Sequence, residues 1–250
     1  MFSATFKNAD EFKRAFDFVH QFVSQCNIVV SPSGLLFEGT DLGQMFCFQV
    51  KLPSTACSHY HCGEDDTLAI SLDVFCKLLK GIGTSDTVTL GNANDDKLTL
   101  SFQQEGKSCQ FHMNLFNLET ETLQLPVMEF DQVVRLPFAL LQSTIKQLSP
   151  MSELLEIEVE CDRPCCVTFR TAHDSPFGRG SIVLSETAVS RVKHVSAIQF
   201  SMEMFRKFSA TKLTDGEVLI EFKEDHPLKL SCNVGITANV ECYMAPKLTG

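Results

Sequence analysis

The side chains best suited to chemistry in this sequence lie in one short segment, Cys57-Ser-His59-Tyr-His61-Cys62. Its cysteines and histidines all offer the sulfur or nitrogen ligands that Zn²⁺ prefers. Their spacing is shorter than that of ordinary zinc sites, and alternate residues of an extended segment point to opposite sides. We therefore predict that this segment binds no metal.

The remaining nucleophilic side chains do not form a catalytic pattern. Cys165 and Cys166 are adjacent, and neighbouring residues on a strand face opposite ways, so we interpret them as partly buried thiols. A nucleophilic enzyme needs a cysteine or serine beside a histidine base. The sequence contains no nucleophile elbow, phosphate-binding loop or metalloprotease motif. We predict a protein that is not an enzyme and needs no cofactor.

The composition indicates a folded protein in a reducing compartment. A chain of 250 residues with 21 Phe has enough apolar residues for one large domain or two of ordinary size. Its eleven cysteines lack framework spacing, and its start, MFSATFKNADEF, lacks the regions of a signal peptide. We expect reduced thiols in the cytosol or nucleus, a mature chain that begins at residue 1, and no membrane segment.

Four amphipathic helices are the elements that must position any functional surface, and we predict them at 9–23, 72–83, 137–149 and 201–213. In the first, Phe12, Phe16 and Val19 fall on one stripe of a 3.6-residue period. Alternating, strand-like segments and turns separate the helices, which begin roughly 63–66 residues apart, as in an internal repeat. We predict an α+β fold of two similar halves, each with two helices packed on antiparallel sheets.

Charge is distributed unevenly between these elements. The chain has a net charge of −10, yet the four helix windows hold eight Lys or Arg against five Asp or Glu. Four helices lining one face would present their positive charge to phosphates. The alternative is ordinary solvated helix faces, which the charge pattern alone favours.

The segment at 116–130, FNLETETLQLPVMEF, differs from the rest of the chain. Its glutamates alternate with apolar residues, and Pro126 argues against a helix or a central strand. A linker usually lacks apolar residues because nothing nearby covers them. We interpret the segment as an extended strap that offers its leucines to a partner, or as a plain linker pinned to the core. The residues alone leave both interpretations open.

Together these features resemble the proliferating cell nuclear antigen (PCNA) family of sliding clamps. The resemblance covers nearly the whole chain, because SPSGLLFEGTD, LAISLDVFCKLLKGIG, the strap and CYMAPKL occur in the same order. The most specific signal is Ala245–Lys247, the sequence APK, which follows Tyr243. The resemblance implies a clamp fold with halves at 1–115 and 131–250, joined by an interdomain connector at 116–130.

The resemblance also implies a closed homotrimer whose helices line a central channel. Its subunits would be joined by pairing of the strand at Cys109–Leu115 with the strand at Gly180–Ser185 of the next subunit. A ring around double-stranded DNA cannot dissociate sideways, so a polymerase tethered to it stays at the primer end. This implies a sliding clamp that serves as processivity factor and docking platform for replication and repair proteins, and that works with a clamp loader. We expect it in the nucleus, or at a viral replication site.

Two functional surfaces follow from the resemblance. A sliding surface needs diffuse positive charge without base readout, and the matching positions are Lys13, Arg14, His20, Lys77, Lys80, Lys146, Arg206, Lys207 and Lys212. In the family, clients insert a short helical turn with apolar anchors beneath the strap. The matching positions of this pocket are Met45, Leu123, Leu125, Pro126, Phe130, Pro227, Tyr243, Ala245 and Pro246.

The sequence departs from the family at two places. Thr40 and Gln44 stand where the family usually has methionine and histidine, so we expect an altered client preference. Arg163 and Pro164 occupy the place of the family's acceptor lysine for ubiquitin. The alternatives are a subunit of a heterotrimeric or checkpoint-type clamp, a clamp relative that works as a monomer bound to its polymerase, and a DNA-independent scaffold that docks peptides.

Overall fold

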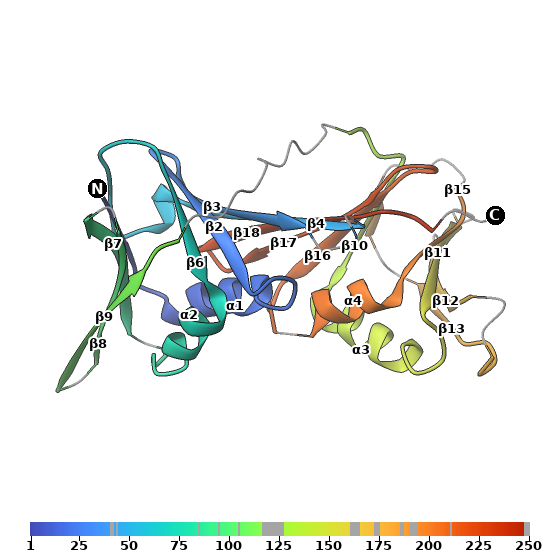
Figure 1. The fold of residues 1–250 in the computed structure, drawn as a ribbon. Helices are drawn as coiled ribbons and strands as arrows, with labels where there is room; N and C mark the ends of the chain where they lie inside the picture. The colour runs from blue at the N-terminus through green and yellow to red at the C-terminus, as the bar shows by residue number, and fades with distance from the viewer. Residues whose placement is uncertain are drawn as a thin grey trace. The chain divides into compact units, whose positions relative to one another are not determined.

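The described part of the chain contains four helices and antiparallel strands, which confirms the predicted α+β fold (Figure 1). The structure is a computed structural model. It describes residues 1–40, 43, 45–84, 86–94, 96–104, 106–116, 128–160, 166–172, 176–185, 188–190, 195–210 and 212–247. Within these ranges it describes only the backbone of residues 93, 94, 104, 188–190, 195 and 196.

The chain divides into two compact units. Unit 1 comprises Met1–Asp41, Phe48–Gln124 and Asn233–Val240, and unit 2 comprises Leu42–Cys47, Leu125–Cys232 and Glu241–Gly250. Strands β4 (Phe46–Pro53), β17 (Leu228–Val234) and β18 (Ala238–Met244) have residues in both units. Each unit is therefore assembled from segments that are far apart in the sequence.

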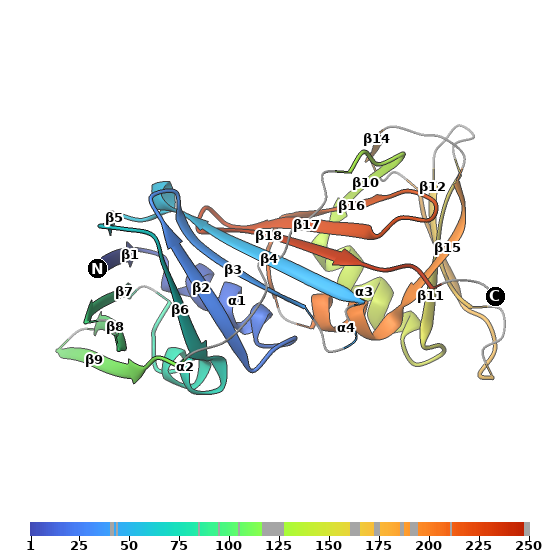
Figure 2. The same ribbon diagram turned by 45° about the horizontal axis from the view of Figure 1, so that its top comes forward.

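Unit 1 contains helices α1 (Ala9–Val19) and α2 (Leu72–Leu79), which pack against each other. Strand β2 (Gln25–Ser31) pairs antiparallel with β3 (Gly34–Thr40) and β6 (Asp66–Ser71), as Figure 2 shows. A 3₁₀ turn, η1 (Ser54–Ala56), follows β4. A second, five-stranded sheet has the order β5-β1-β7-β8-β9. Its strands are β1 (Phe2–Phe6), β5 (His59–Cys62), β7 (Thr87–Asn94), β8 (Lys97–Gln104) and β9 (Lys107–Asn114).

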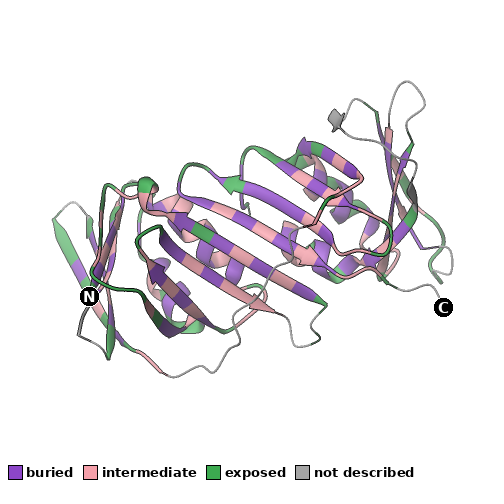
Figure 3. Cartoon of the chain, turned by 90° about the horizontal axis from the view of Figure 1, so that it is seen from above, coloured by how far each residue is buried: buried purple, intermediate pink, exposed green. Residues whose placement is uncertain are grey.

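The core of unit 1 is rich in phenylalanine. Burial alternates along β1, β2 and β4, so that one face of each of these strands is covered (Figure 3). The predicted stripe of α1 is buried, and the ring of Phe16 lies 4.7 Å from that of Phe12 and 4.6 Å from that of Phe75 on α2. Packing of the two apolar stripes thus sets which sides of α1 and α2 face outward.

Unit 2 contains helices α3 (Phe138–Leu148) and α4 (Met202–Ser209), which also pack together. Their contact includes Phe138 and Phe208, with ring centroids 5.8 Å apart. A four-stranded sheet has the order β13-β12-β11-β15, and strand β10 pairs with β14 and β16. These strands are β10 (Gln132–Pro137), β11 (Leu154–Glu160), β12 (Cys166–Thr171), β13 (Ser181–Ser185), β14 (Ala188–Ser190), β15 (Val195–Ser201) and β16 (Glu217–Phe222).

Three of the helices end about four residues before the predicted boundaries at 23, 83 and 213. In α1 the reason is visible beyond Val19, where the backbone N–H groups of Gln21 and Phe22 donate to carbonyls three residues back, at 3.0 and 3.1 Å. Phe22 is half-buried and still packs against the core, with its ring 5.1 Å from that of Phe18 and 5.8 Å from that of Phe48. The apolar spacing therefore continues past the end of the helix.

Candidate functional site

The outward surface of α1 and α2 carries five of the predicted DNA-facing side chains. They are Lys13 and Arg14 on α1, His20 at its C-cap, Lys77 on α2 and Lys80 at its C-cap. All five are half-buried or exposed, because the apolar stripes occupy the opposite sides of the helices.

Carboxylates lie among these cations. The Arg14 guanidinium lies 2.5 Å from Asp10, and His20 Nε2 lies 2.7 Å from Asp73 Oδ1. Asp17 is half-buried on α1. Burial raises its pKa above the ordinary value of 3.8, while the charges of Lys13, His20 and Lys80 oppose that rise. The surface of α1 and α2 therefore combines cations with three carboxylates that face them.

The helices of unit 2 carry the other predicted cations. Lys146 on α3 and Arg206 on α4 are exposed, and neither has an ion-pair partner among the residues that the structure describes. Lys207 pairs with Glu203 at 3.0 Å, and Lys212, which lies beyond α4, pairs with Asp215 at 2.7 Å.

The predicted client pocket is described in part. Leu123, Leu125 and Pro126 lie outside the described residues, as do Gln44, Arg163 and Pro164. In unit 2 the backbone N–H of Ala245 donates to the carbonyl of Met45 at 2.8 Å, and Met45 is 40% exposed. The other members are partly exposed in the same unit: Phe130, Pro227, Tyr243 and Pro246.

A charged cluster beside Tyr243 was not predicted from the sequence. Lys229 Nζ lies 3.1 Å from Glu241 Oε1, 3.5 Å from Glu221 Oε2 and 5.9 Å from the centroid of the Tyr243 ring. The three charged side chains are only 19–20% exposed. Burial lowers the pKa of Lys229, but the hydrogen bond and charge of Glu241 and its other neighbours outweigh burial and raise it above 10.5. Only strand register reveals this cluster, because Glu221 pairs directly with Lys229 between β16 and β17.

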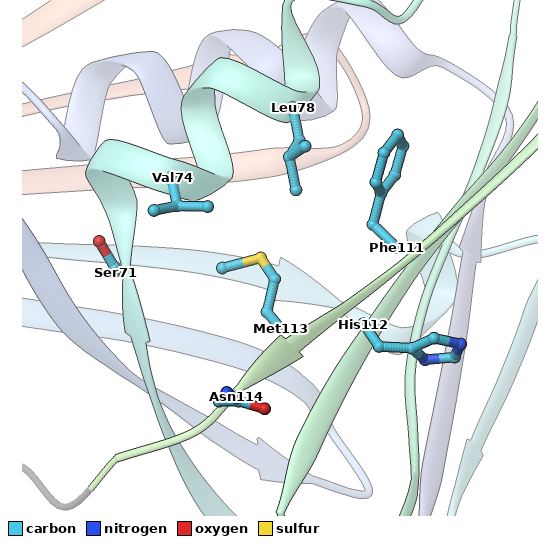
Figure 4. A pocket seen from close by; sticks show the side chains of 7 residues that line it. All are labelled: Ser71, Val74, Leu78, Phe111, His112, Met113 and Asn114. Atoms are coloured by element: carbon cyan, nitrogen blue, oxygen red, sulfur yellow. The ribbon is translucent and has the colours of Figure 1, made fainter.

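An apolar groove of about 390 Å³ lies between α2 and β9 in unit 1. Val74 and Leu78 of α2 face Phe111 and Met113 of β9 across it (Figure 4), and Val74 is 48% exposed. Strand β9 is the outer strand of its sheet, and in unit 2 strand β13 is likewise an outer strand with Val183 58% exposed. Unsatisfied outer strands are surfaces on which another chain can pair.

The last four residues of the histidine- and cysteine-rich segment, His59–Cys62, form β5. Along this strand His59 and His61 are exposed, whereas Tyr60 and Cys62 alternate with them and are half-buried. Among the described residues, no group of three or more potential ligands is placed to hold a metal ion. The Tyr60 hydroxyl instead donates to the carbonyls of Ser31 and Gly34, at 2.5 and 3.1 Å.

Comparison with known proteins identifies relatives of this chain. Residues 1–124 match the N-terminal domain of proliferating cell nuclear antigen. The chain is also 22% identical over 253 residues to a DNA polymerase sliding clamp of Cenarchaeum symbiosum (strain A), and the match covers 99% of each chain. No helix in the described part of the chain has the length and apolar character needed to cross a membrane.

Proposed function

Because this chain belongs to the proliferating cell nuclear antigen family of sliding clamps, whose members are not enzymes, we propose that it encircles double-stranded DNA and holds a DNA polymerase at the primer end. The observation that carries this proposal is the match to a DNA polymerase sliding clamp along 99% of both chains. An alignment of that extent supports a proposal for the chain as a whole and not for one part of it.

Ring closure in this proposal uses the outer strands. Strand β9 of one subunit pairs with β13 of the next, and head-to-tail contacts of this kind close a ring when the rotation is right. The groove beside β9 then receives apolar side chains of the next subunit, with the exposed Val183 as the leading candidate. Three subunits make a homotrimer, which a clamp loader opens onto DNA in the nucleus or at a viral replication site.

Client docking uses the connector at 116–130 together with the C-terminal tail. What supports this part is the bond from Ala245 to Met45, which fixes the tail beside an exposed methionine in unit 2. A few buried anchors carry most of the affinity in such pockets. Replacing Leu125 by glutamate is therefore expected to abolish client binding, and unchanged affinity would refute the pocket assignment.

The test of the ring is native mass over a dilution series, followed by retention on DNA. A homotrimer of the 27.9 kDa subunit has a mass of about 84 kDa. Retention on closed circular DNA that is lost on linearisation would support encirclement. A monomer at all concentrations would refute the self-assembled ring and favour a clamp that is completed by other subunits or held by its polymerase. A trimer without DNA retention would favour the peptide-docking scaffold.

A further inference from the structure

We propose that carboxylates on α1 and α2 neutralise the DNA-facing cations of unit 1, so that α3 and α4 of unit 2 supply most of the attraction to the duplex. This inference rests on the proposed encirclement of DNA. It concerns how the charge is divided between the two units of each subunit.

The helices of unit 1 carry as many acidic as basic side chains. With the C-cap of α2 included, the bases are Lys13, Arg14, Lys77 and Lys80, and the acids are Asp10, Glu11, Asp17 and Asp73. Glu11 is bound elsewhere, because its Oε2 accepts hydrogen bonds from the backbone N–H groups of Ile236 and Thr237 at 3.0 and 3.1 Å.

The three other acids face the cations directly. Asp10 pairs with Arg14, Asp73 pairs with His20, and Asp17 lies where the charges of Lys13 and Lys80 act on it. Among the described residues, Arg14 is the one base of these four that a carboxylate holds in an ion pair. Lys13 lies four residues before Asp17 on α1, and the charges of Lys13 and Lys80 both act on that carboxylate, so its negative charge offsets theirs without an ion pair.

The helices of unit 2 carry more basic than acidic side chains. Their bases are Lys146, Arg206 and Lys207, and their one acid is Glu203, which pairs with Lys207. Lys146 and Arg206 are both exposed. Three bases against one acid leave these helices with a net charge of +2, whereas the four bases and four acids of the unit 1 helices cancel.

This difference matters because binding to duplex DNA depends on the release of counterions by cations that replace them at the phosphates. A carboxylate close to a lysine offsets the positive charge of that lysine, and the carboxylate itself repels the phosphate backbone. Each subunit then presents one attractive helix pair and one nearly neutral helix pair. Loose contact along part of the channel suits a clamp that must slide.

The experiment measures binding of the full-length protein to a labelled 30-base-pair duplex by fluorescence anisotropy between 50 and 200 mM NaCl. Two double variants remove the same charge: Lys146→Gln with Arg206→Gln in unit 2, and Lys13→Gln with Lys80→Gln in unit 1. A third variant, Asp17→Asn, removes the carboxylate whose negative charge offsets Lys13 and Lys80. Asp65→Asn, an exposed change in a loop of unit 1, is its charge-matched control.

The affinity for DNA falls as salt rises, and the slope of log affinity against log salt concentration measures this fall. The double variant in unit 2 is expected to lower the magnitude of this slope by about 1.8. The ratio of the affinities at 50 and 200 mM salt is then about 12-fold smaller than in the unchanged protein. The unit 1 pair is expected to lower the slope by less than half as much. Asp17→Asn is expected to raise the slope and tighten binding beyond the effect of Asp65→Asn. Asp73→Asn gives an independent measurement at an exposed position, with the same expected direction.

Equal loss of slope in the two double variants would overturn the inference, and so would Asp17→Asn and Asp73→Asn both matching the Asp65→Asn control. In both cases the salt-dependent binding of the unchanged protein would leave encirclement standing. A protein whose native mass is that of a trimer but which shows no salt-dependent binding would overturn the inference together with the proposed function.

Discussion

Lys229 offers a direct test of how charge stabilises unit 2 next to the predicted client pocket. Lys229→Met keeps most of the side-chain stem and removes the ammonium that lies between Glu221 and Glu241. The two carboxylates would then face each other without a counter-charge, in a setting where they are about one-fifth exposed. An exposed ion pair contributes about 0–1 kcal/mol to the free energy of unfolding, and breaking a buried pair costs about 3–5 kcal/mol. Because this cluster is partly buried, Lys229→Met should lower the free energy of unfolding by about 2 kcal/mol.

The assay is urea unfolding followed by circular dichroism and by tyrosine fluorescence. The chain has no Trp and two Tyr, so a Tyr60→Phe background leaves Tyr243 as the sole fluorophore of this type. Removing the ammonium, which lies 5.9 Å from its ring centroid, should change the emission of Tyr243 in the native state. The pKa of Lys229 is raised above 10.5, so its contribution is complete below that pH and is lost as pH rises through the folded value.

A control separates lost attraction from repulsion between the carboxylates. The variant that combines Lys229→Met with Glu221→Gln and Glu241→Gln has no charge left in the cluster. It should regain most of the lost stability, because neutral replacements of ion pairs are often tolerated. A Lys229→Met protein within about 0.5 kcal/mol of the unchanged one would refute the reasoning, since that is the range of ordinary surface substitutions.

Three other predictions concern Glu11, Asp17 and Val183. Glu11→Ala should lower the free energy of unfolding in urea by about 3 kcal/mol, because the buried N–H and hydroxyl of Thr237 both donate to the Glu11 carboxylate and would lose their acceptor. The control Asp10→Ala should lower it by less than about 1 kcal/mol. Burial raises the pKa of Asp17 above 3.8, so wild-type stability falls relative to Asp17→Asn as pH rises through the folded value. The Tm advantage of Asp17→Asn should therefore be larger at pH 7 than at pH 3, and the opposite trend would contradict the assignment. Val183→Lys should convert a trimer into subunits of 27.9 kDa in light scattering, whereas a persistent trimer would exclude Val183 from the interface.

The regular elements were predictable because their burial has a simple period. The spacing of Phe12, Phe16 and Val19 identified α1, and all three side chains are buried. The same reasoning extended the helix to 23, because Phe22 continues the apolar spacing after the helical hydrogen bonds have ended. Apolar periodicity indicates which residues contact the core. Residues beyond the end of a helix can also contact the core, so the periodicity does not locate the end of the helix.

The electrostatic pattern was not predictable, because it depends on contacts between distant parts of the chain. His20 and Asp73 are 53 residues apart in the sequence, yet the His20 Nε2 and Asp73 Oδ1 atoms lie 2.7 Å apart. Lys229 meets Glu221 only through the register of β16 and β17. A count of charges in helix windows identified the basic balance but assigned no partner to any side chain. The predicted client residues Leu123, Leu125 and Pro126 lie outside the described part of the chain and stay predictions.

The hydrogen bonds of Glu11 have a consequence for the way the chain is made. Unit 1 includes Asn233–Val240, and Glu11 near the start of the chain accepts from Ile236 and Thr237 near its end. During translation the ribosome delivers residues from the N-terminus onward, at about 5–20 residues per second. The first unit therefore cannot complete its own set of contacts until almost the whole polypeptide has emerged. Nascent chains that stall before residue 236 should keep α1 in a state open to proteases, although all its helical residues have long been synthesised.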